Sequence, residues 1–388
     1  MSDVVIAGIG QYPVGEHWDI SLRSLAARAI LAARRDAGGL KPQALYVGNL
    51  LAPTLSHQQN LGALIVDNTG LGGIEACTTE AAGASGAAAF RLGYLAVASG
   101  YIDVAMVVGV EKYTDMVGPQ VEGALAETTD YDYEAVQGLT LAGQAALLMQ
   151  RYMHEYQVPH SVFGAFPVLA HANAANNPNA MFRRPISMEA YARAEMVSDP
   201  LNLFDVAPYA DGAAAVVLTR PELVPPEVTH KLVRVRGSGL VIDTLAVHDR
   251  PDPLAFDAAR LSVERACRQA GILPSDVDLF ELCDAFSIYA VLSLEAAGFA
   301  ERGQGWKLAQ DGYLDLKSTL PGSMSVSTLG GLKGRGNPLG ATGVYQIVEA
   351  ALQLRGEAGA NQVGGARRAL VQSLGGPAAT AVAHVLEA

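Results

Sequence analysis

The stretch that decides the fold is residues 79–111, TEAAGASGAAAFRLGYLAVASGYIDVAMVVGVE. It begins with a glycine-rich turn at Gly83–Gly86, continues in an alanine-rich segment that predicts a helix from about Ser85 to Ala98, and ends in the apolar run Val104–Val110. A continuous apolar run bounded by glycine is typical of a strand that is buried on both faces. Such strands alternate with covering helices in parallel or mixed sheets. The stretch therefore predicts an α/β protein.

A second copy of this arrangement follows in the C-terminal half of the chain. A helical pattern and the strand-like Ala44–Gly48 in the first half match a helical pattern and the strand-like Val277–Leu282 in the second. At one constant offset of 232 positions, five residues of the first half (Ala26, Ala27, Arg28, Gly39 and Pro42) recur as Ala258, Ala259, Arg260, Gly271 and Pro274. We interpret the match as an internal duplication.

The two halves continue with corresponding elements in the same order. The loop Gly334–Gly343, a helix from about Ala341 to Leu354 and the strands Ala369–Ser373 and Thr380–Leu386 correspond to the turn, helix and strand of residues 79–111. We expect an N-terminal half at 1–225, with a loop domain of about 113–200 inserted in it, and a C-terminal half at 226–388.

Composition excludes several classes of function. The net charge of −12 and the scattered basic residues argue against nucleic acid or an anionic membrane as partner. No apolar run reaches the roughly 18 residues of a membrane span, and the N-terminus predicts a strand and not a signal peptide. The three cysteines (Cys77, Cys267 and Cys283) form no Cys-x-x-Cys pair, which argues against a disulfide framework or a metal site. The simplest compartment is the cytoplasm.

Glycine-rich turns are the first candidates for a functional site. They occur at Gly83–Gly86, Gly336–Gly343 and Ser373–Pro377, at matched places in the two halves. A glycine turn that opens a helix presents unpaired backbone N–H groups, and these stabilise an anion such as the oxyanion of a thioester enolate. A tight turn that only packs is the alternative. Three such turns at matched places favour a shared cleft.

These segments resemble the thiolase superfamily, most closely its sterol-carrier-protein and archaeal branch. The resemblance covers nearly the whole chain and rests on Thr79–Glu111, Asn177–Ile186, Ser198–Thr219, Glu281–Phe286 and Gly330–Gln346. It implies a duplicated, five-layered α/β/α/β/α fold, usually dimeric, and chemistry on coenzyme A thioesters.

The catalytic residues of that superfamily do not carry over. Gly83 stands where the family has its nucleophilic cysteine, and Asn337 stands where it has the activating histidine of the Gly-His-Pro loop. Cys283 replaces the Asn or His before the Glu/Asp-Ala-Phe motif, and Ser373 stands at the acid/base cysteine. Because glycine has no side chain to acylate, no acyl-enzyme can form at position 83.

The residues present at these positions predict a site that has no nucleophilic side chain. By resemblance, the backbone N–H groups of Gly83 and Gly375 form an oxyanion hole, and the Asn337 amide can donate a further hydrogen bond. Tyr345 and Tyr289 are the candidate acid/base pair, because a phenol of lowered pKa can exchange protons. The alternative for each is a helix tyrosine packed into the core. Four basic residues (Arg183, Arg184, Lys333 and Arg335) are candidates for the coenzyme A phosphates.

An enolate-stabilising hole without a nucleophile suits retro-aldol cleavage of a β-hydroxyacyl-CoA to a ketone or aldehyde and a shorter acyl-CoA. The chain resembles the nucleophile-lacking steroid side-chain aldolases once called lipid-transfer proteins, and that resemblance implies a small zinc-ribbon and OB-fold partner protein. We expect a homodimer, a coenzyme A thioester as substrate, and no metal or cofactor bound in this chain. Two alternatives stay open, a noncatalytic acyl-CoA-binding subunit and an acyltransferase that uses Cys77 or a partner's thiol.

Overall fold

The computed structural model describes residues 3–388. Ten strands form one continuous mixed sheet in the order β10-β9-β11-β12-β8-β1-β7-β4-β2-β3. The two halves of the sheet are joined where β1 pairs with β8. The half-sheets have the same plan, β3-β2-β4-β7-β1 in the first and β10-β9-β11-β12-β8 in the second. In each, the two outer pairings are parallel and the others antiparallel. The predicted α/β class and the duplication are confirmed.

The strands of the two halves correspond in chain order as well as in position. The first half contains β1 (Val5–Gln11), β2 (Ala44–Gly48), β3 (Glu75–Thr79), β4 (Val104–Glu111) and β7 (Gly212–Thr219). The second half contains β8 (Val233–Ile242), β9 (Leu279–Glu281), β10 (Ser325–Val326), β11 (Arg368–Gly375) and β12 (Thr380–Glu387). Every residue of β4 and of β7 is buried, as the apolar run in each predicts.

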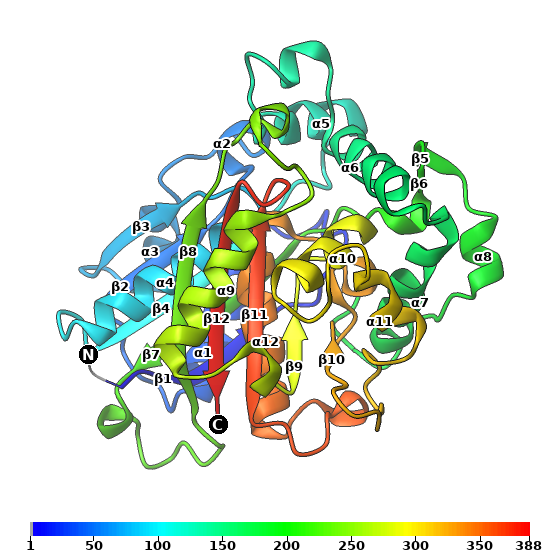
Figure 1. The fold of residues 1–388 in the computed structure, drawn as a ribbon. Helices are drawn as coiled ribbons and strands as arrows, with labels where there is room; N and C mark the ends of the chain where they lie inside the picture. The colour runs from blue at the N-terminus through cyan, green and yellow to red at the C-terminus, as the bar shows by residue number, and fades with distance from the viewer. Residues whose placement is uncertain (1–2) are drawn as a thin grey trace.

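Helices cover the sheet in layers (Figure 1). On one outer face lie α1 (Leu22–Asp36) and α3 (Leu61–Thr69), and on the other lie α9 (Asp257–Ala270) and α10 (Ser287–Ala296). The two central helices, α4 (Ser85–Ala98) and α12 (Thr342–Arg355), pack against each other and against strands of both halves. The outer helices, the two half-sheets and the central helix pair between them form the five layers of the duplicated thiolase arrangement that the resemblance implied.

Glycine allows the two central helices to begin side by side. A Cβ added at Gly86 would lie 2.7 Å from the carbonyl oxygen of Gly340, and one added at Gly343 would lie 2.4 Å from the backbone nitrogen of Ala87. Real Cβ atoms do not approach backbone so closely, so only glycine permits this contact. The contact brings the glycine turn before α4 next to the loop before α12, although the two lie far apart in the sequence.

The segment between β4 and β7 is mainly helical and gathers at the upper right in Figure 1. The loop domain predicted at about 113–200 falls within it, and its weak strand signal agrees with the single short pair β5–β6. Its elements are α5 (Gly118–Ala126), α6 (Leu141–Tyr156), α7 (Ala165–Ala174), α8 (Met188–Ala192), β5 (Met196–Ser198) and β6 (Leu201–Asn202). Two further short helices are α2 (Ala52–Leu55) and α11 (Gly305–Gln310). Among residues 3–388, every helix is too short or too polar to cross a bilayer.

Candidate active site

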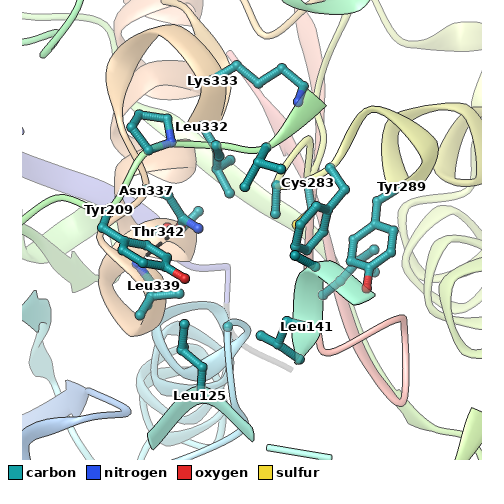
Figure 2. A pocket seen from close by; sticks show the side chains of 18 of the residues that line it. Leu125, Leu141, Tyr209, Cys283, Tyr289, Leu332, Lys333, Asn337, Leu339 and Thr342 are labelled. Atoms are coloured by element: carbon teal, nitrogen blue, oxygen red, sulfur yellow. Dashed lines mark hydrogen bonds between the residues drawn. The ribbon is translucent and has the colours of Figure 1, made fainter. Parts of the chain in front are cut away.

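A cavity of about 420 Å³ lies where the two central helices begin and the inserted segment covers them (Figure 2). Most of its wall is apolar, formed by side chains such as Leu125, Leu141, Phe182, Leu203, Phe286 and Leu339. Polar side chains interrupt this wall, together with the backbone of Gly83: Glu122, Thr128, His171, Tyr209, Cys283, Tyr289, Lys333, Asn337, Thr342 and Ser373. An apolar cavity with few convergent polar groups is the usual form of a small-molecule site.

Gly83 reaches the cavity from the turn just before α4. Its N–H donates to no carbonyl or side-chain acceptor found among residues 3–388. It is therefore available to a ligand, beside the positive end of the α4 dipole. A Cβ added at Gly83 would lie 2.7 Å from the carbonyl oxygen of Leu374. Any side chain at position 83 would thus require the surrounding backbone to shift.

Asn337 reaches the cavity from the loop before α12, and buried contacts hold that loop in place. The Asn337 N–H donates to Pro208 O at 3.0 Å, and its carbonyl accepts from Tyr113 Oη at 2.7 Å. The side-chain Oδ1 accepts from Leu339 N and Thr342 Oγ1, each at 3.2 Å. In the part of the chain that the structure describes, Nδ2 has no acceptor, and Figure 2 shows it directed into the cavity. Asn337 can therefore donate to a substrate oxygen.

Tyr209 is a cavity residue that the sequence analysis missed. It lies beside Asn337 in a short parallel bridge, and its hydroxyl donates to Glu122 Oε1 of α5. Burial, and then the hydrogen bond to the Glu122 carboxylate, raise the pKa of Tyr209 above its ordinary value. The phenol is therefore protonated at neutral pH, and it is hydrogen-bonded to the side chain of Glu122. No local pattern predicts this pair, because 87 positions separate its members.

Tyr289 lines the cavity opposite Tyr209 and Asn337 in the view of Figure 2. Its ring packs edge-on against Phe256 and Phe286, with centroid distances of 5.6 and 5.0 Å. Its hydroxyl is buried and has no hydrogen-bond partner among residues 3–388. Burial raises the pKa of Tyr289 above its ordinary value, opposite to the lowered pKa expected for an acid/base phenol, so the group is protonated at neutral pH.

Tyr345 does not reach the cavity, and its predicted approach to the cleft is wrong. The side chain is fully buried on the β1/β7 side of α12, and its hydroxyl donates to Tyr12 O at 2.5 Å. The Arg335 guanidinium lies 5.1 Å from its ring centroid, and Gly212 leaves room for its hydroxyl. Position 345 lies on the side of α12 that faces away from Asn337, so the phenol points away from Asn337. Tyr345 is thus a packed core tyrosine.

The third glycine turn closes one side of the cavity. Gly375 ends β11, and the residues that line the cavity are its neighbours Leu374 and Gly376, together with Ser373. Ser373 Oγ donates to Gln346 Oε1 at 2.6 Å. Gly375 itself does not line the cavity and pairs with Thr380 of β12, while the Ser373 hydroxyl is held by Gln346.

The cysteines are poorly placed to act as nucleophiles. Cys283 lines the cavity, but burial raises the pKa of its thiol to about 11, so little thiolate exists at neutral pH. Cys77 lies on the exposed edge strand β3 and does not line the cavity. Burial and Glu75 raise the pKa of the Cys77 thiol as well.

Two of the four candidates for the coenzyme A phosphates are interior residues. Lys333 donates to Asp205 O at 2.6 Å and Phe204 O at 3.2 Å, and Arg335 forms a fully buried ion pair with Glu349 at 2.6 Å. Burial lowers the pKa of Lys333 to about 8. Both side chains are bonded to buried groups of the protein, so the prediction that they meet phosphates is wrong. Arg183 and Arg184 lie exposed.

Residues 3–388 contain no group of three or more His, Cys, Asp or Glu side chains placed to hold a metal ion. The polar groups of the cavity include a backbone glycine, one amide, two phenols, a carboxylate, an imidazole, an amine, a thiol and hydroxyls. Such a set can stabilise developing negative charge on an oxygen and can move protons.

Comparison with known families identifies the fold. Residues 4–222 match the N-terminal domain of thiolase, and residues 239–388 match the thiolase C-terminal domain-like family. This chain belongs to the thiolase superfamily. It is therefore built for acyl-CoA thioester chemistry, and the cavity lies between the two thiolase halves.

Relatives within the thiolase superfamily carry different activities in their names. An acetyl-CoA acetyltransferase of Methanothermobacter thermautotrophicus is 41% identical over 387 residues, which cover 99% of each chain. The benzoylsuccinyl-CoA thiolase subunit BbsB of Thauera aromatica is 32% identical and covers 93% of this chain and 91% of its own. Among solved structures, an Ltp2-ChsH2(DUF35) aldolase matches with a TM-score of 0.86 and 26% identity, over 100% of this chain and 98% of that one.

Proposed function

We propose that this thiolase-superfamily protein is a carbon–carbon lyase that cleaves a β-hydroxyacyl-CoA by a retro-aldol reaction. The products are a ketone or aldehyde and a shorter acyl-CoA. No acyl-enzyme forms, and free coenzyme A is not consumed. A steroid side chain is one acyl group that would suit the apolar wall of the cavity.

One observation carries this proposal. Position 83 has no side chain, and the Leu374 carbonyl occupies the direction in which one would project. The N–H of that same cavity-lining residue donates to no acceptor among residues 3–388. The site therefore keeps a donor for an enolate oxygen while it excludes the covalent nucleophile.

The cavity side chains supply the other roles. The substrate's β-hydroxyl gives its proton to the Tyr209 oxygen as the phenol proton passes to Glu122. The α–β carbon bond then breaks, its electron pair forms the thioester enolate, and the β carbon leaves as a carbonyl. Donors at Gly83, Asn337 and Gly375 hold the enolate oxygen. Tyr289 protonates the α carbon, which releases the shorter acyl-CoA. Glu122 then gives the substrate proton to solvent, and Tyr289 takes up a proton from solvent.

An acyltransferase is the second candidate, because the relative from Methanothermobacter thermautotrophicus bears that name. It would need a thiol at the cavity, and Cys283 is the residue in that position. The raised pKa of the Cys283 thiol and the amide in place of a histidine at position 337 weigh against it. A noncatalytic acyl-CoA-binding subunit is the third candidate.

We also propose that the protein is a cytoplasmic homodimer that works with a small zinc-ribbon and OB-fold partner. The edge strand β3 supports the dimer, since its residues are almost all exposed and its outer edge pairs with no other strand among residues 3–388. The name of the matching aldolase structure, which includes a DUF35 chain, supports the partner.

The test is an assay with a panel of β-hydroxyacyl-CoAs, with and without iodoacetamide. The lyase should produce a carbonyl compound and a shortened acyl-CoA and should survive alkylation. Loss of activity on alkylation of Cys283 would favour the acyltransferase. Binding without turnover, with and without a partner protein, would favour the noncatalytic subunit.

A further inference from the structure

A second cavity, of about 560 Å³, lies between the inserted segment and the start of the C-terminal half. Its wall includes Glu134, Gln144 and Arg250, which are all buried, and His248, which is 53% exposed. Arg250 donates from Nε to Thr244 O at 2.9 Å and from Nη1 to Pro377 O at 2.6 Å. Through Pro377, Arg250 anchors the turn that closes one side of the active-site cavity.

Three buried polar atoms between the two cavities have no hydrogen-bond partner among residues 3–388. They are Tyr289 Oη, Arg250 Nη2 and Gln144 Oε1. Leaving a buried donor or acceptor unsatisfied costs about 1–3 kcal/mol, so such groups normally bind ordered water. A guanidinium donor, an amide acceptor and a phenol form a set that water can satisfy.

Tyr289, Arg250 and Gln144 each interact with Glu134, which lies near a histidine at the surface. Burial is the largest cause of the raised pKa of Tyr289, the nearby Cys283 and Glu134 raise it further, and the Arg250 charge lowers it. Arg250 and Glu134 therefore lie within electrostatic range of the phenol. Gln144 Nε2 donates to Glu134 Oε1 at 3.2 Å, and His248 Nδ1 lies 3.8 Å from that same oxygen. A polar path thus leads from the buried phenol to an exposed imidazole.

We propose that this path is a proton relay, in which water bound between Tyr289, Arg250 and Gln144 connects the phenol to Glu134 and His248. Arg250 is a positioning residue, because it orients that water and holds the Gly376–Pro377 turn. The proposal rests on the lyase function, which assigns Tyr289 to protonation of the α carbon. After each turnover a proton passes from solvent to His248, to Glu134, through the water and back to the Tyr289 oxygen.

A crystal structure of the full chain tests the relay without any assay. At a resolution that shows ordered solvent, we expect at least one water hydrogen-bonded to two of the three partnerless atoms. A dry gap, or a gap filled by a side chain, would overturn the proposal. The position of ordered water does not depend on turnover. The crystal structure therefore tests the path even if the protein proves not to be a lyase.

Kinetics of matched variants test the relay in the working enzyme. Gln144→Leu should lower kcat about tenfold, leave KM within about twofold and enlarge the solvent deuterium isotope effect on kcat. Gln150→Leu, the same change on the same helix but outside both cavities, should do none of these. Arg250→Lys keeps the charge and should retain most of the kcat that Arg250→Met loses. Equal losses in the two arginine variants, or an unchanged isotope effect in Gln144→Leu, would contradict the relay.

Discussion

A Cβ placed on Gly83 would lie 2.7 Å from the carbonyl oxygen of Leu374. We propose from the resemblance that Gly83 stands where thiolases have their nucleophile, so this contact bears directly on the proposed reaction. The obstacle is backbone and not the end of a flexible side chain, and therefore β11 or the turn before α4 would have to shift to admit any side chain. The loss of the nucleophile is thus part of the packing between the two halves.

Restoring the cysteine should not restore a thiolase. We expect Gly83→Cys to lower the free energy of unfolding by about 1–3 kcal/mol, because the new side chain overpacks the contact with Leu374. It should produce no thiolysis, since Asn337 cannot activate a thiol as histidine does. Urea denaturation and a thiolysis assay measure the two effects, with Gly72→Cys, which has open space around it, as the control. A stable Gly83→Cys variant with thiolase activity would contradict this account.

Tyr209 should matter to catalysis and Tyr345 should not. Removing the phenol in Tyr209→Phe should lower kcat by about 10²–10⁴, the usual contribution of a positioned acid/base group. Tyr345→Phe loses only the buried hydrogen bond to Tyr12 O, so it should cost about 1 kcal/mol of stability and leave kcat nearly unchanged. Steady-state kinetics and denaturation curves of the two variants separate these effects. A large loss of kcat in Tyr345→Phe, with little loss in Tyr209→Phe, would mean that Tyr345 and not Tyr209 acts in the site.

Asn337→Asp should impair the stabilisation of the enolate. The variant keeps the Oδ1 acceptor for Leu339 and Thr342 but replaces the free Nδ2 donor by an oxygen. We expect kcat to fall by about 10²–10³, as when one oxyanion donor is removed, with a smaller change in KM. Asn68→Asp, at an exposed helix position, is the control for the added charge. Wild-type kcat in Asn337→Asp would exclude this residue as a donor.

His384 should make the protein sensitive to acid. It is fully buried in β12, and burial lowers the pKa of its imidazole to about 3. Below pH 6.5 the unfolded chain takes up a proton that the folded chain refuses, so stability is full above that pH and falls as the pH falls. Between pH 7 and 5 this amounts to about 2 kcal/mol.

The variant His384→Gln can still donate to Ala87 O, the present acceptor at 3.2 Å, but cannot titrate. Its loss of unfolding free energy between pH 7 and 5 should be smaller than that of the wild type by that amount. The exposed His154→Gln should behave as the wild type does. Identical pH dependence in His384→Gln and the wild type would mean that His384 does not set the acid limit.

Local patterns predicted the framework of this protein well. The α4 helix begins and ends where the alanine-rich segment indicated, and β4 differs from its prediction by one residue. The constant offset between Ala26 and Ala258 marked the equivalent helices α1 and α9 of the two halves. Such features depend on residue type at short range, and the sequence shows them directly.

The side chains of the site were harder to predict, because their placement depends on contacts between distant segments. The glycine turns were found, since each is a short local pattern. Tyr345 was misplaced because its distance from Gly343 in the sequence does not reveal which way it faces around α12. The Tyr209–Glu122 pair could not be found, since Glu122 comes from a helix of the inserted segment.

The most direct test of the central claim is one incubation with a β-hydroxyacyl-CoA in D₂O, without free coenzyme A, followed by mass spectrometry of products and protein. We expect a carbonyl product, a shortened acyl-CoA with one deuterium on its α carbon, and no gain in the mass of the protein. An acylated protein, or cleavage that requires free coenzyme A, would contradict the central claim.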